Sequence, residues 1–275
     1  MSDDWRDKPI RDASSVILIR ERDASSEVEI FMLRRHRKSS FMSSAFVFPG
    51  GAADPGDADP RETGARELFE EAGVLLTRDS VADTQLSSWR ASVNDDGADL
   101  AGLLGTAGVS LDLEAVHYFS HWITPSVERK RFSAKFYVAA LPAGQTPSFD
   151  NKETVDEIWV TPTEALAKSK ELKLPPPQVR TFIELQDACA GGLDAVFAEC
   201  AQRADHPHPI MPRLQQSEGG GFCLLLPWDR DYETSGSGDL RVMPADHPLA
   251  VGASRFVLED MTWKNVQAPD SANVG

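Results

Sequence analysis

The chain has 275 residues, of which 41% are hydrophobic and 26% are charged, and this composition excludes a disordered, collagen-like or coiled-coil chain. Its 28 Lys and Arg residues against 43 Asp and Glu give a net charge of −15, which repels phosphate groups. General binding to nucleic acid or to an anionic membrane is therefore excluded, and an anionic ligand would need a local basic patch or a metal ion.

The pattern of apolar residues predicts an α+β fold with a mixed sheet. Strands are expected in chain order at residues 15–19, 28–33, 46–48, 74–76, 116–123, 131–141 and 157–160, the first two forming a hairpin. Helices are expected at residues 60–72, 86–91, 99–104, 163–170, 178–189 and 193–203, with the prolines at 175–177 halting the chain before the last two. Two β-like runs follow, at residues 222–226 and 255–266.

The chain is expected to comprise a main domain at residues 10–188 and a C-terminal extension at 189–275. The polar, Asp-rich segment 77–113 is predicted to be a helical insertion, and the extension to add a helix and a β-hairpin packed on the same domain. No apolar stretch has the length of a membrane-spanning helix, no signal peptide is visible, and the three cysteines lack Cys-x-x-Cys spacing. We therefore expect a cytoplasmic protein without zinc, and the oligomeric state is left open.

The helix at residues 60–72 has a well-marked start and end. Asp59 is a typical N-cap, Pro60 suits the first helical position, and Glu62 completes a capping box, while Gly73 ends the helix. One face is an apolar stripe formed by residues at helical spacing, namely Ala65, Leu68, Phe69 and Ala72.

Three carboxylates fall on the opposite face, which is expected to face solvent. Glu67, Glu70 and Glu71 are spaced at i, i+3 and i+4, where like charges repel and destabilise the helix. An oxygen-only anionic cluster suits a hard divalent cation such as Mg²⁺ or Mn²⁺. The alternative is a solvated acidic face, which is the commoner explanation of a run of glutamates.

The wider pattern favours the metal. Gly50 and Gly51, a loop, and then residues 66–74, Arg-Glu-Leu-Phe-Glu-Glu-Ala-Gly-Val, resemble the Nudix box. By average residue frequencies, the second half of that motif occurs by chance in about one such chain in 10⁴ to 10⁵. The resemblance implies a Nudix α/β/α sandwich and a hydrolase acting on a nucleoside diphosphate linked to another group.

The loop between the two halves departs from the Nudix pattern. The spacing from Gly51 to Arg66 is one residue too long, and Ala58 stands where the family has a Glu that orients the Arg. Glu62 or Asp57 is expected to pair with Arg66 instead. The departure leaves the three helix carboxylates intact.

The resemblance also implies roles for the motif residues. Glu67 and Glu71 would be the principal metal ligands, Glu70 a ligand or base, and the carbonyl of Gly50 or Gly51 would complete the shell. Metals at a diphosphate neutralise charge and activate water for in-line attack on phosphorus.

A further catalytic Glu of the family often comes from a loop six residues before a strand Trp. Glu153 has this place relative to Trp159, and Glu157 is the nearer alternative. The competing interpretation of Glu153 is an exposed loop carboxylate without a role.

Two basic segments, at residues 34–38 and 129–131, are candidates for substrate binding. They supply four proposed contacts, Arg35, Arg37, Arg129 and Arg131. The alternative is that they are solvated strand ends. The first segment and the motifs between residues 121 and 178 resemble the acyl-coenzyme A diphosphatase group of Nudix enzymes, although Ser40 and Ser44 replace an Arg and a Gly.

The residues leave three hypotheses. The first is a metal-dependent diphosphatase that cleaves coenzyme A or acyl-CoA to adenosine 3′,5′-bisphosphate and (acyl-)4′-phosphopantetheine. The second keeps the chemistry but acts on ADP-ribose, a dinucleotide or a nucleotide sugar, because one fold hosts many substrates. The third is a non-catalytic Nudix-like binding module, although no glutamate of the motif's second half is lost here.

Overall fold

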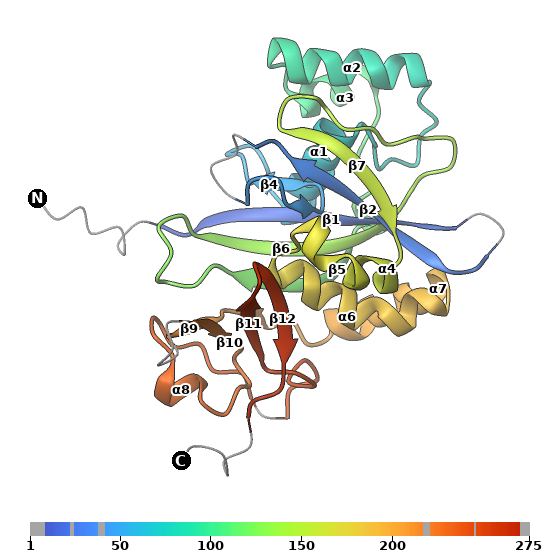
Figure 1. The fold of residues 1–275 in the computed structure, drawn as a ribbon. Coiled ribbons are helices and arrows are strands. Elements are labelled where there is room, and N and C mark those ends of the chain that lie inside the picture. The colour runs from blue at the N-terminus through green and yellow to red at the C-terminus, as the bar shows by residue number, and fades with distance from the viewer. Residues whose placement is uncertain (1–8, 23–24, 38–41, 217–220, 245, 270–275) are drawn as a thin grey trace, which may run out of the picture.

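The computed structural model describes residues 9–22, 25–37, 42–216, 221–244 and 246–269, with the elements labelled in Figure 1. The strands are β1 (Arg11–Glu21), β2 (Val28–Arg35), β3 (Phe46–Val47), β4 (Gly50–Ala52), β5 (His117–Ile123), β6 (Phe132–Ala140), β7 (Thr154–Val160), β8 (Pro209–Ile210), β9 (Arg213–Gln216), β10 (Phe222–Leu225), β11 (Arg255–Glu259) and β12 (Thr262–Val266). The helices are α1 (Pro60–Ala72), α2 (Asp83–Asp96), α3 (Leu100–Ala107), α4 (Pro162–Ala167), α5 (Ser169–Leu172), α6 (Pro176–Ala190), α7 (Leu193–Ala204) and α8 (Tyr232–Ser235), with the 3₁₀ helix η2 (Leu113–Ala115).

An eight-stranded mixed sheet forms the centre of the fold. Its strand order is β3-β2-β1-β6-β5-β8, with β4 also paired to β1 and β7 to β2. The predicted hairpin is formed by β1 and β2, with Ile19 opposite Ile30. β1 pairs with β6 and β5 with β8 in parallel, and the other pairs are antiparallel. The predicted α+β class with a mixed sheet is confirmed.

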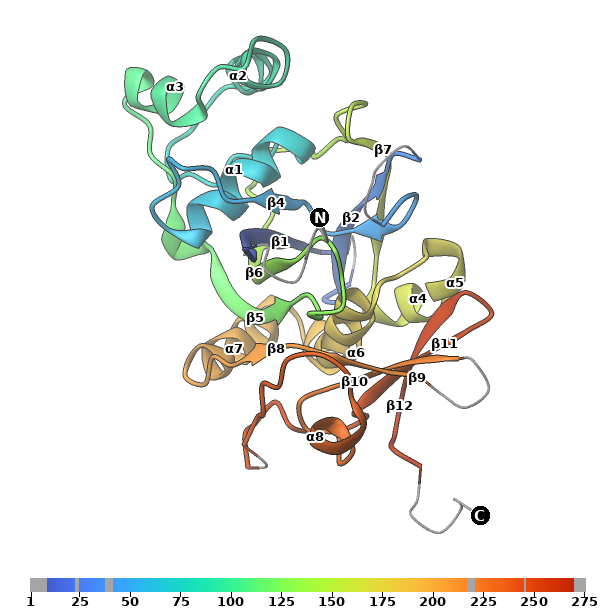
Figure 2. The same cartoon turned by 90° about the vertical axis from the view of Figure 1, so that its left-hand side faces the viewer.

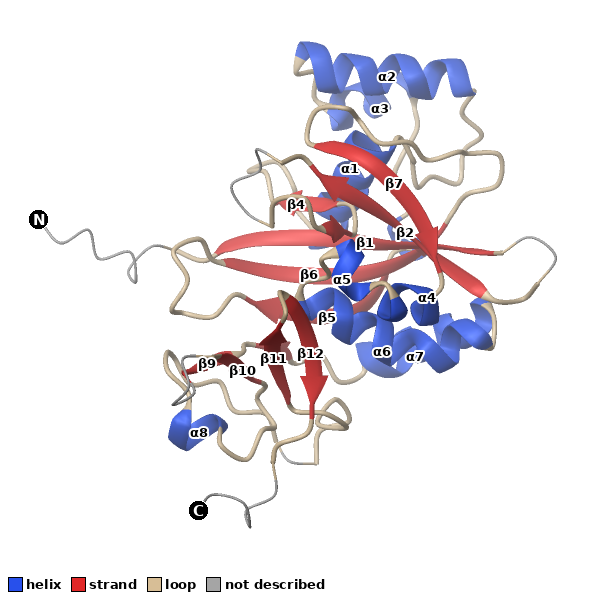
Figure 3. Cartoon of the chain, viewed as in Figure 1, coloured by secondary structure: helices blue, strands red, loops and turns tan. Residues whose placement is uncertain are grey.

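Helices cover both faces of this sheet, as Figures 2 and 3 show. Because side chains alternate along a strand, Val16 and Leu18 of β1 pack on the α1 side, whereas Ile17 and Ile19 pack with α6 and α7. All four are fully buried, and each such aliphatic side chain contributes about 1.5–3 kcal/mol to folding. This is the predicted α/β/α arrangement.

Helix α1 begins and ends where the sequence predicts. The Asp59 side chain accepts a hydrogen bond from the Arg61 N–H, and Glu62 completes the capping box. Gly73 adopts the left-handed conformation with φ 73°, and its N–H donates to the Phe69 carbonyl. These caps fix the register of the motif helix over the sheet.

The insertion forms two helices that are longer than predicted, α2 and α3. Their apolar side chains build a small core of their own, which includes Trp89 and Leu104, against Phe69 of α1 and Leu75 behind it. Figure 2 shows α2 and α3 beyond α1, on the far side from the sheet. The insertion therefore packs on the motif helix and not on the sheet.

Three details of the predicted elements are wrong. Residues 74–76 are not a strand, because the Gln145 side chain bonds both the N–H and the carbonyl of Leu75, at 2.8 Å each, in place of a neighbouring strand. Pro176 begins α6 and does not stop the chain before it, since a proline needs no N–H partner in a first helical turn. The helix expected at 163–170 is split into α4 and α5, with Lys168 between them.

The C-terminal extension is more β-rich than the single hairpin predicted. β9 to β12 form a second, four-stranded sheet, and β8 joins the edge of the main sheet beside β5. Ile210, Leu226 and Phe256 of the extension belong to the same buried cluster as α6. Within the described ranges, no helix has both the length and the apolar character needed to cross a membrane.

Candidate active site

The glycine pair lies directly against the carboxylate face of α1. β4 pairs with β1 so that Gly51 is opposite Ser14, and the Gly50 N–H donates to Glu71 Oε2 at 2.9 Å. A Cβ atom on Gly51 would lie 2.4 Å from Glu67 Oε1, so only glycine leaves room for that carboxylate. The two halves of the motif therefore meet at one place.

The carboxylate face is less exposed than the helical spacing predicts. Glu71 is only 4% exposed, so the expectation that its side chain faces solvent is wrong. The side chains of Glu67 and Glu70 are 16% and 26% exposed. The reason is tertiary: the Gly50 strand covers this side of α1, and a helical pattern alone contains no information about a covering strand.

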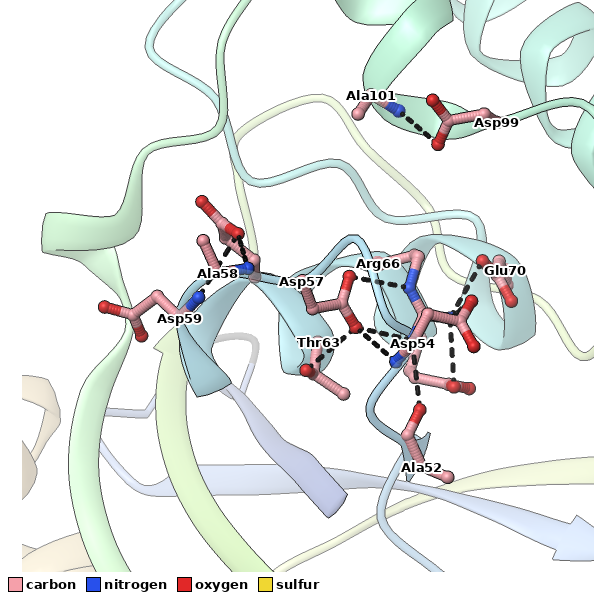
Figure 4. A network of polar contacts seen from close by, with 12 residues as sticks. Ala52, Asp54, Asp57, Ala58, Asp59, Thr63, Arg66, Glu70, Asp99 and Ala101 are labelled. Carbon is pink, nitrogen blue, oxygen red and sulfur yellow. Dashed lines mark hydrogen bonds and ion pairs between the residues drawn. The ribbon is translucent and has the colours of Figure 1, made fainter. Parts of the chain in front are cut away.

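Arg66 is held by carboxylates on both sides (Figure 4). Its guanidinium donates to Asp57 Oδ2 at 2.9 Å, and it also donates to Glu67 Oε1 at 3.1 Å and Glu70 Oε1 at 3.2 Å. A fourth bond, at 3.1 Å, goes to the Ala52 carbonyl beside the glycine pair. Arg66 thus ties the loop to the helix carboxylates.

Asp57 is the partner of Arg66, and Glu62 is not. The Glu62 carboxylate instead accepts from the backbone N–H groups of Ala58 and Asp59, at 2.8 and 3.3 Å, as part of the helix cap. The longer loop of this chain therefore places Asp57 in the orienting position that a Glu at Ala58 would otherwise have.

Burial raises the pKa of both inner carboxyls. The pKa of Glu67 rises to about 7, chiefly because burial disfavours its charged form and because Glu70 and Glu153 are near, although Arg66 opposes the shift. The pKa of Glu71 rises to about 8 through burial, with further contributions from Glu67 and Glu153. Neighbouring carboxyls whose pKa values are raised in this way have too few positive partners for all of them to ionise. A bound cation would balance their negative charge.

The donors fit a hard divalent cation. Glu67, Glu70 and Glu71 offer only oxygen ligands, and Gly51 leaves the space beside Glu67 that a Cβ would fill. Among the residues that the structure describes, no three His, Cys, Asp or Glu side chains already converge as a metal-ligand set. In this conformation the carboxylate oxygens already accept hydrogen bonds from Arg66 and from the Gly50 N–H. A cation would have to share these oxygens with both donors.

Glu153 and Glu157 have different surroundings. Glu153 is exposed at the start of β7, on the side where its charge acts on both Glu67 and Glu71. Glu157 Oε2 instead accepts from the Phe149 N–H at 2.6 Å and so anchors the preceding loop. The structure therefore brings Glu153 toward the carboxylate cluster and gives Glu157 a structural partner.

Strand alternation separates the first two arginines of the basic segment. Leu33 packs on the α1 side, so Arg35, two residues on, follows it to that side, where its charge opposes the raised pKa of Glu71. Arg34 lies on the other face, where it pairs with Asp156 at 3.1 Å and its guanidinium carbon lies 6.0 Å from the centre of the Phe46 ring. Among the described residues of this segment, 34–37, Arg35 is thus the cation whose charge acts on Glu71.

The remaining predicted cations do not gather with Arg35. Arg131 has an 8% exposed side chain that donates to the Thr124 carbonyl at 3.3 Å and lies 3.7 Å from Asp239 of the extension, so these contacts are with other parts of the chain than the carboxylate cluster. Arg129 is exposed in the connection between β5 and β6, and Arg37 is exposed just after β2. Lys38 and Ser40 lie outside the described residues.

Arg90 of α2 also reaches the motif helix, and no motif in the sequence marks a role for it. Its guanidinium donates to the carbonyls of Glu70 and Glu71, at 3.1 and 2.6 Å. A signal was available, because the last turn of α1 has no basic residue to bind its unpaired carbonyls. The partner could not be named, since it lies in an insertion without a recognisable motif.

Known proteins are similar to this chain over the region that contains helix α1. A family model of the NUDT19 Nudix domain matches residues 55–185. The chain is thus similar to the Nudix hydrolase family over residues 55–185, just under half of its length. A solved Nudix hydrolase structure from Alicyclobacillus acidocaldarius superposes with a TM-score of 0.57 at 23% identity, covering 66% of this chain and 93% of that chain, which supports the Nudix fold.

Curated relatives are similar at moderate identity. The chain is 29% identical over 237 residues to the acyl-coenzyme A diphosphatase NUDT19 of Xenopus laevis, covering 62% of each protein. It is 29% identical over 249 residues to the putative nudix hydrolase 7 of Caenorhabditis elegans, covering 86% of this chain and 80% of that protein. The human NUDT19 is 33% identical over 197 residues, covering 65% of this chain and 52% of that protein. The chain thus spans less than two-thirds of the length of the frog and human relatives.

Proposed function

We propose that this protein is a Nudix diphosphatase that cleaves coenzyme A or acyl-CoA to adenosine 3′,5′-bisphosphate and (acyl-)4′-phosphopantetheine, with Mg²⁺ or Mn²⁺. The observation that carries the proposal is the buried cluster of Glu67 and Glu71 against Gly51, where burial raises the pKa of both carboxyls. The similarity to proteins named acyl-coenzyme A diphosphatase supports the substrate class.

In this proposal the carboxylates of Glu67 and Glu71, with Glu70 and a carbonyl of Gly50 or Gly51, hold the cation. When bound, the cation neutralises diphosphate charge and makes water a better nucleophile. The water oxygen forms a bond to one phosphorus, the bridging P–O bond to the other phosphate breaks, and the water proton passes to a carboxylate. Glu153 is the proposed acceptor, with Glu70 as the alternative.

Arg66 is proposed to orient the carboxylates and not to touch the substrate. It bonds both Glu67 and Glu70 from one guanidinium, at 3.1 and 3.2 Å, while Asp57 fixes it from the opposite side. The planar guanidinium holds the two glutamates through Nη1 and Asp57 through Nε and Nη2, which keeps the three carboxylates in a fixed relation that a flexible Lys ammonium would not.

Substrate selection is proposed to depend on Arg35, and Arg37, exposed just after β2, is proposed as a further contact. Coenzyme A carries a 3′-phosphate that ADP-ribose and dephospho-CoA lack, so an acidic protein must place a cation near it. Arg35 lies on the α1 side of β2, where it acts on Glu71. Arg131 is left out because its partners are in the C-terminal extension, and Arg129 because it lies in the β5–β6 connection.

The test is a panel of diphosphates assayed by mass spectrometry with Mg²⁺ and with Mn²⁺. We expect CoA and acyl-CoA to be cleaved to adenosine 3′,5′-bisphosphate, and dephospho-CoA to be a poorer substrate. Faster cleavage of ADP-ribose than of CoA would refute the substrate assignment but keep the chemistry. Absence of cleavage across the panel would refute both.

A pair of arginine variants tests the selectivity. Arg35→Ala should raise KM for CoA about 10-fold, because one phosphate contact by Arg contributes about 1.5–3 kcal/mol, and should raise KM for dephospho-CoA less. Arg131→Ala is the matched control, since it removes an Arg that faces the extension. It should lower thermal stability without changing the ratio of the two KM values. An equal change of that ratio in both variants would contradict the role of Arg35.

A further inference from the structure

The C-terminal end of α1 presents carbonyl groups that its own residues do not bind. The last turn carries Glu70 and Glu71 and has no basic residue. Helix carbonyls at this end lack intrahelical partners and form the negative pole of the helix dipole. In α1 that negative pole lies beside two carboxylates of the proposed site. A cationic side chain from another segment is therefore attracted both by the pole and by the carboxylates.

Helix α2 of the insertion supplies this cation. Arg90 Nε donates to the Glu70 carbonyl at 3.1 Å, and Arg90 Nη2 donates to the Glu71 carbonyl at 2.6 Å. Asn94, one turn further along α2, donates to the Glu70 carbonyl at 3.0 Å. Gly73 completes the fit, because a Cβ there would lie 2.9 Å from Arg90 Nη1.

The same guanidinium also binds the loop that carries Glu153. Arg90 Nη1 donates to Ser148 Oγ at 2.9 Å and Nη2 to the Ser148 carbonyl at 2.8 Å. At the other end of this loop, Lys152 bonds the Asn94 carbonyl and pairs with Asp95 of α2 at 2.7 Å. Helix α2 therefore connects two segments of the site. Its hydrogen bonds run to the main chain of Glu71 on one side and to Lys152, the residue before Glu153, on the other.

We propose that Arg90 is a positioning residue that sets Glu70 and Glu71 of α1 relative to Glu153 of the loop. This rests on the proposed function, in which these carboxylates hold a cation and accept a proton. Arg90 touches no reacting atom in this proposal. It acts because one planar guanidinium bridges two chain segments whose side chains must face each other, and small displacements at such a site have large effects on rate.

The test compares Arg90→Gln with Arg78→Gln. Arg78 is a matched control, because it lies in the same insertion and is 73% exposed, and because it pairs at 2.9 Å with Asp112 and not with a carbonyl at the C-terminal end of α1. The readouts are Mn²⁺ affinity by electron paramagnetic resonance, kcat and KM for CoA, and the thermal midpoint. Arg90→Gln should weaken Mn²⁺ binding about 10-fold, as loss of outer-shell partners does. It should also lower kcat about 10- to 100-fold, with KM for CoA little changed. Arg78→Gln should leave all these values unchanged except the thermal midpoint.

A second variant separates geometry from charge. Arg90→Lys keeps the positive charge at the helix end but cannot bond Glu70, Glu71 and Ser148 together, so it should restore stability more than kcat or Mn²⁺ affinity. If Arg90→Gln lowers only the thermal midpoint and leaves Mn²⁺ affinity at the wild-type value, Arg90 is merely structural and the inference is wrong. Mn²⁺ binding is measured without substrate, so this outcome is distinct from failure of the chain to cleave CoA.

Discussion

Two clusters of shielded charges lie on opposite faces of the main sheet, and only one of them is balanced. Between α6 and α7, Glu184 accepts from Arg180 and, at 2.8 Å, from Arg203, while Arg203 also pairs with Glu199 at 2.6 Å. On the α1 side, Glu67, Glu70 and Glu71 meet Arg66, which Asp57 already pairs. The first cluster has a cation for each anion, and the second has anions in excess.

The difference separates a structural ion network from a binding site. A buried charge without a partner costs several kcal/mol, so folded proteins pair such charges or leave them to a ligand. Arg180 also donates to the carbonyls of Val251 and Ala253, at 2.9 and 3.2 Å, and so joins α6 to the C-terminal extension. The balanced cluster holds the fold together. The unbalanced cluster leaves negative charge for a cation.

The largest expected effect is loss of turnover when a charge of the unbalanced cluster is removed. Glu71→Gln and, separately, Glu67→Gln should lower kcat at least ~10²-fold, the scale of losing one electrostatic stabiliser. The fold should persist, because Gln keeps the shape and can still accept from the Gly50 N–H. Steady-state kinetics with circular dichroism checks this. Glu62→Gln, on the same helix but in the cap, is the control and should keep kcat. Turnover of Glu71→Gln near wild type would remove the metal assignment.

Removing a charge from the balanced cluster should lower the free energy of unfolding and not the turnover. Glu184→Gln leaves two guanidinium groups facing a neutral amide, and breaking a buried pair in this way costs about 3–5 kcal/mol. Urea unfolding should show this loss, while kcat of the folded fraction stays at the wild-type value. A stability loss below about 1 kcal/mol would mean that water already screens this cluster, and the contrast between the two faces would be weaker than proposed.

Local sequence signals predicted helix α1 and the carboxylates that it carries. The caps Asp59 and Gly73 and the spacing of Glu67 to Glu71 are set within one segment, so the helix and its carboxylates could be predicted from the sequence. The burial of Glu71 could not, because it depends on a glycine strand about twenty positions away that the apolar pattern does not mark as a strand.

Contacts between distant segments explain what could not be predicted. The charged neighbours of Arg131 predict a substrate contact, but they give no indication of its contacts with Met211 and Asp239, which lie in a tail without a motif. Residues 74–76 have the apolar pattern of a strand, yet the main chain of Leu75 bonds the side chain of Gln145. In each case a local pattern gave the residue type correctly and only the tertiary fold decided its partner.

Removing the carboxylate of Glu153 should have a smaller effect on kcat than removing a carboxylate of α1. Glu153→Gln is expected to lower kcat about 10-fold, below the ~10²–10⁴-fold contribution of a sole general base, because Glu70 is available as a proton acceptor. Glu157→Gln is the paired variant, since Glu157 holds the Phe149 N–H and should affect stability before rate. The kcat values of the two variants, measured side by side, show which glutamate contributes more to turnover. A larger kcat loss in Glu157→Gln would move the catalytic role to that residue.

The smallest expected effect is in the pH dependence of stability without metal. The pKa values of Glu67 and Glu71, about 7 and about 8 in the fold, lie above their ordinary value of 4.5. Between pH 4.5 and 8 the folded chain therefore holds more protons on these groups than the unfolded chain, and linkage makes their contribution to stability fall as pH rises. Glu71→Gln removes one such group. In EDTA at pH 8 it should melt about 2–4 °C above wild type, equivalent to about 1 kcal/mol, whereas at pH 5 the two should coincide. Added Mn²⁺ should reverse the order at pH 8, because it binds the ionised wild-type cluster and has lost a ligand in the variant. Thermal unfolding under these conditions decides the point, and a variant that is less stable than wild type in EDTA at pH 8 would show that the cluster is already balanced without a cation.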